Sequence, residues 1–157
     1  VSQSHTSDSI FISTMFQAAS LSKPVTATVA MILSEQGKLD LDSSVNSMLS
    51  LWQIPENDYT KNISISPRMI LTHTSGLNVP GFGGYEISDS VPSITEILNG
   101  TQPAKNDPII PQFVPNTKWS YSGGGYIVLQ LLLEEITKNS FPDLMKRSLF
   151  EPLQMNN

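Results

Sequence analysis

The longest apolar-rich segment, residues 19–36, constrains the fold of this chain more than any other feature. Its apolar residues recur at helical spacing, and the main stripe consists of Leu21, Val25, Val29 and Ile32. Other apolar residues fill the remaining faces: Ala27, Ala30, Met31 and Leu33. A helix that is apolar nearly all round is normally buried on several sides. We therefore expect a central helix over residues 19–36, ended by Gly37.

The start of this helix brings a hydroxyl and an amine within reach of one another. Ser20 and Lys23 are three residues apart, so on a helix their side chains share one face. A serine becomes a nucleophile when a neighbouring base takes its proton, and a neutral lysine can be that base. The helix dipole and burial both disfavour a positive charge in the first turn, which favours the neutral form of Lys23. Alternatively, Ser20 is an ordinary N-cap, although Lys23 stands where a capping box has Glu or Gln. A Ser-x-x-Lys pattern also arises by chance, so the pair alone leaves both interpretations open.

The composition excludes several classes of function. The 157 residues, 39% of them hydrophobic and 15% charged, suit one domain with a sizeable core. A net charge of −5 and singly scattered basic residues argue against a nucleic-acid partner. The chain has no cysteine, and His5 and His73 are too far apart for a histidine-rich zinc site, so we expect no metal and no cofactor. No apolar stretch reaches transmembrane length and no signal peptide is visible, so any membrane association is expected to come from segments outside this chain.

The remainder of the chain reads as helices joined by loops. A polar lead-in over residues 1–14 includes a short strand-like run at residues 10–12. Further helices are expected over residues 45–52, 68–72, 93–98, 125–138 and 141–150. A connection with several prolines covers residues 101–118, and loops of that length in compact domains are usually functional or disordered. Almost no strand is predicted.

A second motif, Trp-Ser-Tyr-Ser-Gly-Gly-Gly-Tyr, covers residues 119–126. Tyr121 can direct its phenol into a cleft while the glycines allow close approach of the backbone. A phosphate-binding loop is excluded, because no Lys-Ser/Thr follows the glycines. The alternative is a glycine-rich helix entry in which Tyr121 is a packing residue. The motif alone does not decide between these interpretations.

Five segments in order carry a family resemblance. They are residues 16–27 with Ser-x-x-Lys, 37–42 (Gly-Lys-Leu-Asp-Leu-Asp), 71–77 (Leu-Thr-His-Thr-Ser-Gly-Leu), 121–126 and 150–153 (Phe-Glu-Pro-Leu). Together they resemble the serine β-lactamase and penicillin-binding-protein family, specifically the branch of class C β-lactamases, DD-peptidases and related esterases. The resemblance runs from about residue 16 to the C-terminus.

The resemblance implies roles for individual residues. Ser20 would be the acylated nucleophile, Lys23 its proton partner and Tyr121 a residue that helps to shuttle the proton. The Ser20 N–H would give half of the oxyanion hole. The implied substrates are β-lactams, D-Ala-D-Ala peptides of peptidoglycan or esters, and the implied location is the periplasm or cell envelope. The His73 segment would match a structural turn near the cleft.

Two departures from the family pattern matter. The tyrosine motif of the family usually reads Tyr-x-Asn, and Gly123 stands where the Asn belongs. That Asn normally contacts the substrate amide, so esters become more plausible relative to β-lactams and peptides. A Ser-x-Asn at residues 44–46 comes too soon after Ser20 and is interpreted as a helix start. The third motif of the family, Lys-Thr-Gly or His-x-Gly after the tyrosine, is absent.

We therefore expect a mostly α fold, the helical lobe of the β-lactamase/transpeptidase-like α/β fold, with most of the sheet lobe missing from this chain. Residues 1–157 would form a partial domain, with a lead-in over 1–15, the helical lobe over 16–157, and the missing remainder of the domain as a partner. The expected parent activity is acyl-enzyme hydrolysis or transfer. The alternatives are a penicillin-recognising sensor that does not turn over, and a helical interaction module without chemistry.

Overall fold

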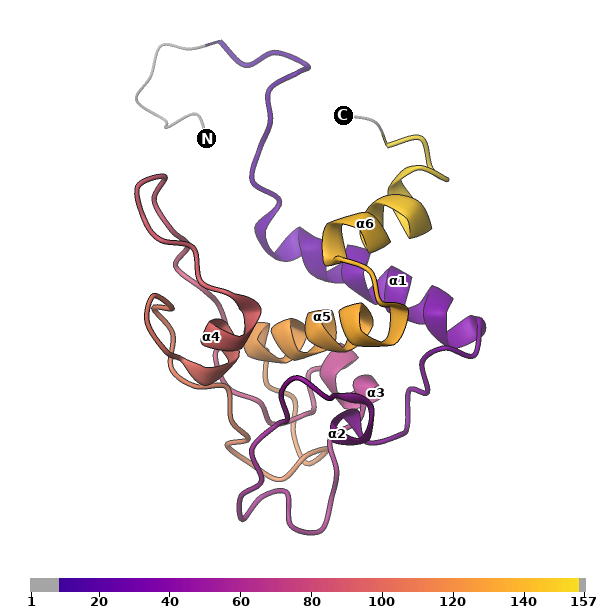
Figure 1. Cartoon of the computed structure of the whole chain (residues 1–157), viewed down its shortest axis with the longest axis vertical. Coiled ribbons are helices and arrows are strands. Elements are labelled where there is room, and N and C mark those ends of the chain that lie inside the picture. Colours follow the sequence, from indigo (N-terminus) through magenta and orange to yellow (C-terminus); the bar gives the residue numbers. More distant parts are fainter. Residues whose placement is uncertain (1–8, 156–157) are drawn as a thin grey trace.

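The computed structural model describes residues 9–155, and helices are the regular elements of this part of the chain (Figure 1). The first is a 3-10 turn, η1 (Ala19–Leu21), which leads directly into α1 (Ser22–Glu35). The other α-helices are α2 (Val45–Met48), α3 (Pro67–Leu71), α4 (Ile94–Asn99), α5 (Gly123–Thr137) and α6 (Phe141–Met145). A π-helical turn, η2 (Lys146–Phe150), continues α6. The described residues contain no strand, only a single bridge between Leu77 and Pro111, so the expected mostly α architecture is confirmed.

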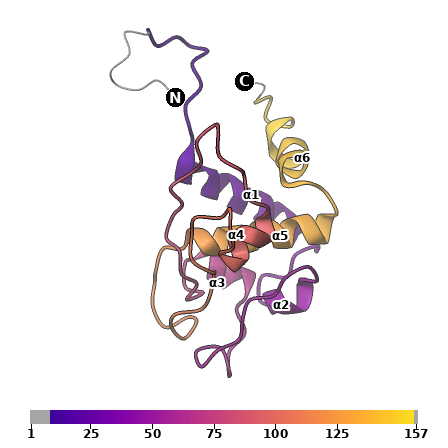
Figure 2. The same ribbon diagram turned by 60° about the vertical axis from the view of Figure 1, so that its left-hand side comes forward.

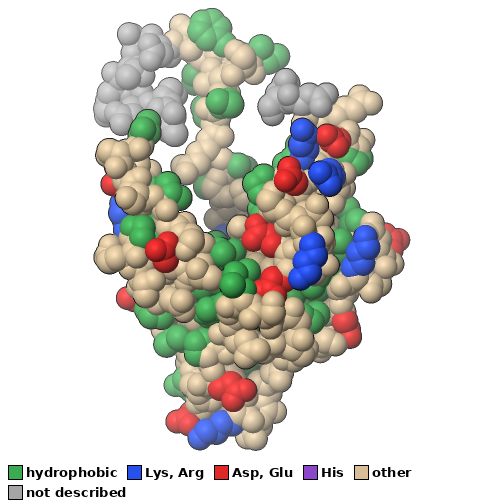
Figure 3. Space-filling model, in the orientation of Figure 1, with side chains coloured by type: hydrophobic (Ala, Val, Ile, Leu, Met, Phe, Trp, Pro, Cys, Tyr) green, Lys and Arg blue, Asp and Glu red, His purple; other side chains and the backbone are tan. Residues whose placement is uncertain are grey.

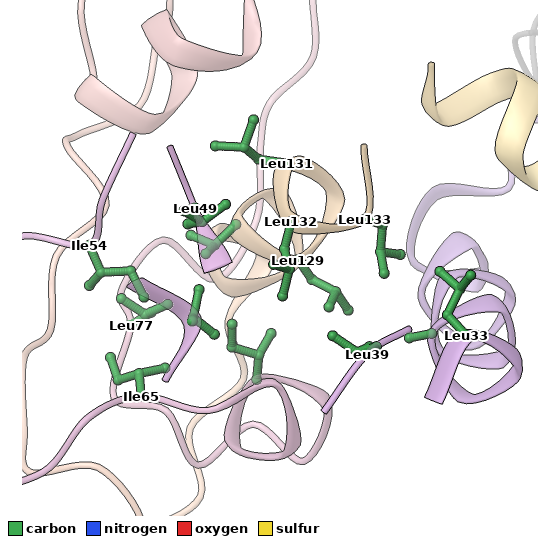
Figure 4. Packing of buried hydrophobic residues seen from close by; sticks show 14 of the residues in the cluster. Leu33, Leu39, Leu49, Ile54, Ile65, Leu77, Leu129, Leu131, Leu132 and Leu133 are labelled. Atoms are coloured by element: carbon green, nitrogen blue, oxygen red, sulfur yellow. The ribbon is translucent and has the colours of Figure 1, made fainter. Parts of the chain in front are cut away.

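Helix α5 is the centre of the described fold. It packs against α1, α2, α3, α4 and α6, and two views place it between α1 on one side and α3 on the other (Figures 1 and 2). Three consecutive leucines, Leu131, Leu132 and Leu133, are almost completely buried, because neighbours surround the helix on all sides. Figure 4 shows them within the cluster of buried side chains that includes Leu39 and Leu77.

The expectation that the helix over residues 19–36 is the central one is wrong for the described chain. The buried residues of α1 lie on one face and comprise Thr26, Val29, Ala30 and Leu33. Leu21 and Met31 remain 72% and 50% exposed. An apolar groove of about 430 Å³ lies between the start of α1 and α6, and Leu21, Val25 and Phe150 are among its lining residues. The all-round apolar pattern of α1 therefore exceeds what the described residues cover.

Local chemistry explains most helix ends. Gly37 follows α1 with φ +69°, and Lys38 N–H donates to the Leu33 carbonyl (2.9 Å), which is the expected left-handed stop. Helix α2 stops at Met48, not at Trp52 as expected. The N–H groups of Ser50 and Leu51 donate to the Glu135 carboxylate of α5 (2.7 and 3.0 Å), so they are taken by a distant side chain instead of a continued helix.

The strand-like run at residues 10–12 is also not a strand. Thr14 N–H donates to the Phe11 carbonyl and Phe11 N–H donates to Thr14 Oγ1, both at 2.9 Å, so the segment closes a turn. Its three side chains are exposed, which removes the packing that a strand needs. The rest of the polar lead-in, residues 1–8 including His5, lies outside the described residues.

Charged side chains are dispersed over the molecule. On the face in Figure 3, basic and acidic groups stand singly or in small groups among apolar ones. None of the described helices has both the length and the apolar character needed to cross a membrane.

Candidate active site

A strained turn presents Ser20 at the exposed start of α1. Ala19, a residue with a Cβ atom, has φ +46°, and Leu21 N–H donates to the Ala18 carbonyl (3.0 Å) to close the turn. The residue that caps α1 is Leu21, and no side chain caps either η1 or α1. The N-cap interpretation of Ser20 is therefore wrong, because its hydroxyl does not satisfy the helix N-terminus.

The Ser20 hydroxyl instead lies near the Lys23 amine. Lys23 Nζ is 3.5 Å from Ser20 Oγ, the outer limit of a hydrogen bond, and such contacts often shorten only when substrate is bound. The same Nζ lies 4.9 Å from the centre of the Tyr121 ring and 5.5 Å from that of the Tyr126 ring. These ring faces attract the ammonium group and fix the position of Lys23 between α1 and the start of α5.

Tyr121 completes the cluster from a segment about a hundred residues further along the chain. The pKa of the Tyr121 phenol is lowered below its usual value, first by hydrogen bonding with the Ser20 side chain and then by hydrogen bonding with Lys23. Tyr121 directly precedes Ser122, the N-cap of α5, whose Oγ accepts from Gly125 N–H (2.8 Å) and donates to the Asn78 carbonyl (2.9 Å). The structure thus brings together the three residues that the sequence singled out.

His73 lies beside this cluster. Its ring centre is 4.5 Å from that of Tyr121, and its Nδ1 accepts a hydrogen bond from Ser122 N–H (3.2 Å). Burial and then the charge of Lys23 lower the pKa of His73. The hydrogen bond to the backbone agrees with the structural interpretation of this histidine. Its contact with Tyr121 was not predicted, because the two residues are far apart in the sequence.

Position 123 has little room for a side chain. A Cβ atom on Gly123 would lie 3.0 Å from the Pro80 carbonyl oxygen and 3.3 Å from Phe82 Cε2. The loop at residues 79–82 therefore occupies the space next to the position where the family pattern has Asn. The glycine and the loop fit one another, so this departure is accommodated by the fold.

Two other sequence interpretations have a clear structural outcome. The Ser-x-Asn at residues 44–46 does begin a helix, and both polar atoms of the Asn46 side chain pair with the backbone of Ile54 (2.8 and 3.0 Å). These bonds give Asn46 a structural role in the loop after α2. Among residues 9–155, no group of three or more His, Asp or Glu side chains is arranged to hold a metal ion.

Comparisons with known proteins agree with this geometry. The family described as Beta-lactamase matches residues 8–157. Penicillin-binding protein 4* of Bacillus subtilis (strain 168) is 32% identical over 143 residues, which are 90% of this chain and 30% of that protein. Penicillin-binding protein 4 of Amycolatopsis lactamdurans is 27% identical over 142 residues, 90% of this chain and 35% of that protein.

Solved structures share the fold. The D-amino acid amidase from Ochrobactrum anthropi SV3 superposes with a TM-score of 0.70 at 24% identity, over 90% of this chain and 36% of that one. EstCE1, a hydrolase with promiscuous acyltransferase activity, gives a TM-score of 0.67 at 27% identity, over 87% of this chain and 37% of that one. The chain thus spans about a third of the length of these relatives. It corresponds to a helical part of their fold and belongs to the Beta-lactamase family.

Proposed function

We propose that the protein carrying this chain is a serine hydrolase or acyltransferase in which Ser20 forms an acyl-enzyme. The observation that carries the proposal is the convergence of Ser20, Lys23 and Tyr121, which come from two distant segments. A hydroxyl, an amine and a phenol with a lowered pKa are the groups that nucleophilic acyl transfer needs.

The proposed acylation step follows from these groups. Ser20 Oγ attacks the substrate carbonyl carbon, and a C–O bond forms while the carbonyl electron pair moves to the oxygen. The Ser20 proton passes to the pair formed by Lys23 and Tyr121. Collapse of the tetrahedral intermediate breaks the bond to the leaving amine or alkoxide, which takes that proton back from the pair. Water, or another acceptor, then removes the acyl group from Ser20 by the reverse sequence.

The positions and charges of Tyr121 and Lys23 support this path for the proton. The lowered pKa of the Tyr121 phenol makes the phenolate more accessible, so Tyr121 can accept a proton near neutral pH more readily than an ordinary tyrosine. Lys23 lies over the Tyr121 ring and within reach of Ser20. As an ammonium it stabilises negative charge on Tyr121, and as a neutral amine it can accept the Ser20 proton.

The substrate class proposed is an ester or another acyl compound with a good leaving group, with β-lactams and D-Ala-D-Ala peptides as the alternatives. Gly123 supplies no side-chain amide, and the loop at residues 79–82 fills the adjacent space. A site without a hydrogen-bonding partner for the substrate amide has less preference for amide substrates over esters. The names of the relatives include penicillin-binding proteins, an amidase and EstCE1, a hydrolase with promiscuous acyltransferase activity. Esters, β-lactams and peptides are therefore all substrates to be tested.

The remaining parts of the proposal concern segments beyond the described residues. An oxyanion hole needs two donors, of which the Ser20 N–H would be one. We assign the second donor to the remainder of the domain, which would pack against the open apolar face of α1. Export to the periplasm or cell envelope, where peptidoglycan peptides and β-lactams are met, belongs to the same proposal.

The test uses the full-length protein and its Ser20→Ala variant as the blank. A fluorescent penicillin labelling gel, a nitrocefin assay and a short-chain ester assay are run side by side. The proposal expects Ser20-dependent labelling together with ester turnover that exceeds nitrocefin turnover. Labelling without turnover of any substrate would instead favour a penicillin-recognising sensor. Absence of both labelling and turnover would refute the proposed hydrolase and leave the interaction module.

A further inference from the structure

We propose that His73 is a positioning residue for Tyr121, which it holds by binding the peptide N–H groups on both sides of that tyrosine. The inference deepens the proposed function and rests on it for the role of Tyr121. Its structural content, the control of the Tyr121 phenol by a residue after α3, can be measured without any turnover.

The two hydrogen bonds enclose Tyr121. Ser120 N–H donates to the His73 carbonyl (2.8 Å), and Ser122 N–H donates to His73 Nδ1 (3.2 Å). The imidazole also lies against the phenol ring, with 4.5 Å between ring centres and 38° between the planes. One residue therefore fixes the backbone before Tyr121, the backbone after it and one face of its side chain.

The backbone of His73 is suited to this task. Its φ of +58° places it in the left-handed region, and its own N–H donates to the Ile70 carbonyl (3.1 Å) at the end of α3. Among residues with a side chain, Asn, Asp and His adopt this region most readily. The turn alone needs only such a residue, or glycine. The imidazole adds what the turn does not require, namely an acceptor directed at Ser122 N–H.

The acceptor depends on the protonation state of the imidazole. Nδ1 can accept from Ser122 N–H only while it carries a lone pair, so the neutral ring holds its proton on Nε2. A proton on Nδ1 would place two donors face to face and break the bond. The groups that face the imidazole are the Lys23 ammonium, the Tyr121 phenol and the Tyr126 phenol. Burial and Lys23 lower the pKa of His73, so the bond persists at neutral pH and is lost only as the pH falls through that lowered value.

The test compares two variants of the full-length protein that both permit φ +58°. His73→Asn keeps an acceptor, because Asn Oδ1 occupies the place of Nδ1, whereas His73→Gly removes it. The first readout is ionisation of Tyr121, followed by NMR of tyrosine labelled with ¹³C at Cζ and assigned with Tyr121→Phe. His73→Gly should raise the pKa of the Tyr121 phenol towards its usual value, and His73→Asn should hold it near that of the parent.

The second readout is the rate of Ser20 labelling by a fluorophosphonate between pH 5 and 8. A lost neutral hydrogen bond should slow His73→Gly by about threefold to tenfold near neutral pH, where the parent keeps the bond, and this difference should shrink at the acid end. Protonation of the pair formed by Lys23 and Tyr121 should lower the rate of every variant at the acid end. The parent should lose more rate there than His73→Asn does, because Asn does not titrate. Thermal melts of each variant separate this effect from lost stability.

The possible outcomes are distinct. An unchanged Tyr121 pKa in His73→Gly, or an acid limb that is the same in His73→Asn as in the parent, would overturn the inference. If the parent is not labelled at all, the proposed function fails, and the NMR titration still decides whether His73 controls the phenol. If His73→Gly does not fold, the pH dependence of labelling decides, because the parent should lose more rate at the acid end than His73→Asn does.

Discussion

Two neighbouring glycines in the first turn of α5 should respond to the same substitution to different extents. A Cβ atom on Gly124 would lie 2.7 Å from the Asn78 carbonyl oxygen and 3.2 Å from side-chain atoms of Ile109. On Gly125 it would meet only side-chain atoms, Ser122 Oγ at 3.3 Å and Ile70 Cγ2 at 3.4 Å. The Asn78 oxygen cannot give way easily, because it accepts from Ser122 Oγ.

The magnitudes predict the difference in stability between the two variants. Alanine is favoured over glycine within a helix by up to about 1 kcal/mol, and both positions share this gain. Overpacking a tight site costs about 1–3 kcal/mol. On Gly125 the propensity gain is offset by a shift of a few tenths of an ångström in Ser122 Oγ, so Gly125→Ala should keep the free energy of unfolding within about 1 kcal/mol of that of the parent. Gly124→Ala should be less stable than Gly125→Ala by about 1–3 kcal/mol, a difference from which the propensity gain cancels.

The assay is guanidinium denaturation of both variants in the full-length protein, together with the rate of Ser20 labelling. The clash at Gly124 would also lengthen the hydrogen bond from Gly124 N–H to the Val79 carbonyl (2.9 Å) and displace the first turn of α5. Because Tyr121 lies just before this turn, only Gly124→Ala should slow labelling. Equal stability of the two variants would refute the close approach of α5 to the loop after α3.

Four further predictions concern the proposed chemistry and the part of the domain that lies outside this chain. Lys23→Arg keeps the charge, but arginine does not deprotonate and so cannot accept the Ser20 proton, and ester turnover should fall by about 10²-fold or more. Near-normal turnover would exclude Lys23 as a proton acceptor. Tyr121→Phe keeps the ring and removes the phenol; it should melt at the parent temperature while acylation, deacylation or both slow, and an unchanged rate would make Tyr121 a packing residue. Residues 1–157 purified alone should turn over nitrocefin and esters at least about 10²-fold more slowly than the full-length protein, because one oxyanion donor is expected in the remainder of the domain. Turnover within about tenfold of the full-length rate would contradict this. The same fragment should self-associate through the apolar groove between α1 and α6 in sedimentation experiments, and a strictly monomeric fragment would argue against an interacting face there.

Contacts between residues close in the sequence were predictable. The spacing of Ser20 and Lys23 predicted that their side chains meet, and they do, although Ser20 lies in η1 just before α1. Gly37 marked the end of α1. The helix after the glycines was predicted as well, although it begins two residues earlier than expected, at Gly123. Glycine propensity argues against helix there, and burial in the core overrides it.

Contacts between distant segments were not predictable in the same way. The bond from Ser122 N–H to His73 joins residues 49 apart, and neither pattern around them specifies the other. The end of α2 depends on the Glu135 carboxylate, a partner 85 residues from Ser50. The apolar pattern of α1 misled the assignment of the central helix, because a pattern records which faces are apolar and not which segment covers them.

The central claim, that Ser20 is the nucleophile, is tested most directly by locating the acyl group. The full-length protein is treated with a β-lactam or a fluorophosphonate, digested and analysed by mass spectrometry. Ser20→Ala and Ser22→Ala form a matched pair, because both serines are exposed and only two residues apart, Ser20 in η1 and Ser22 at the start of α1. The account predicts a single adduct on Ser20, lost in Ser20→Ala and retained in Ser22→Ala. An adduct on Ser22, or none in a protein that still turns over its substrate, would contradict it.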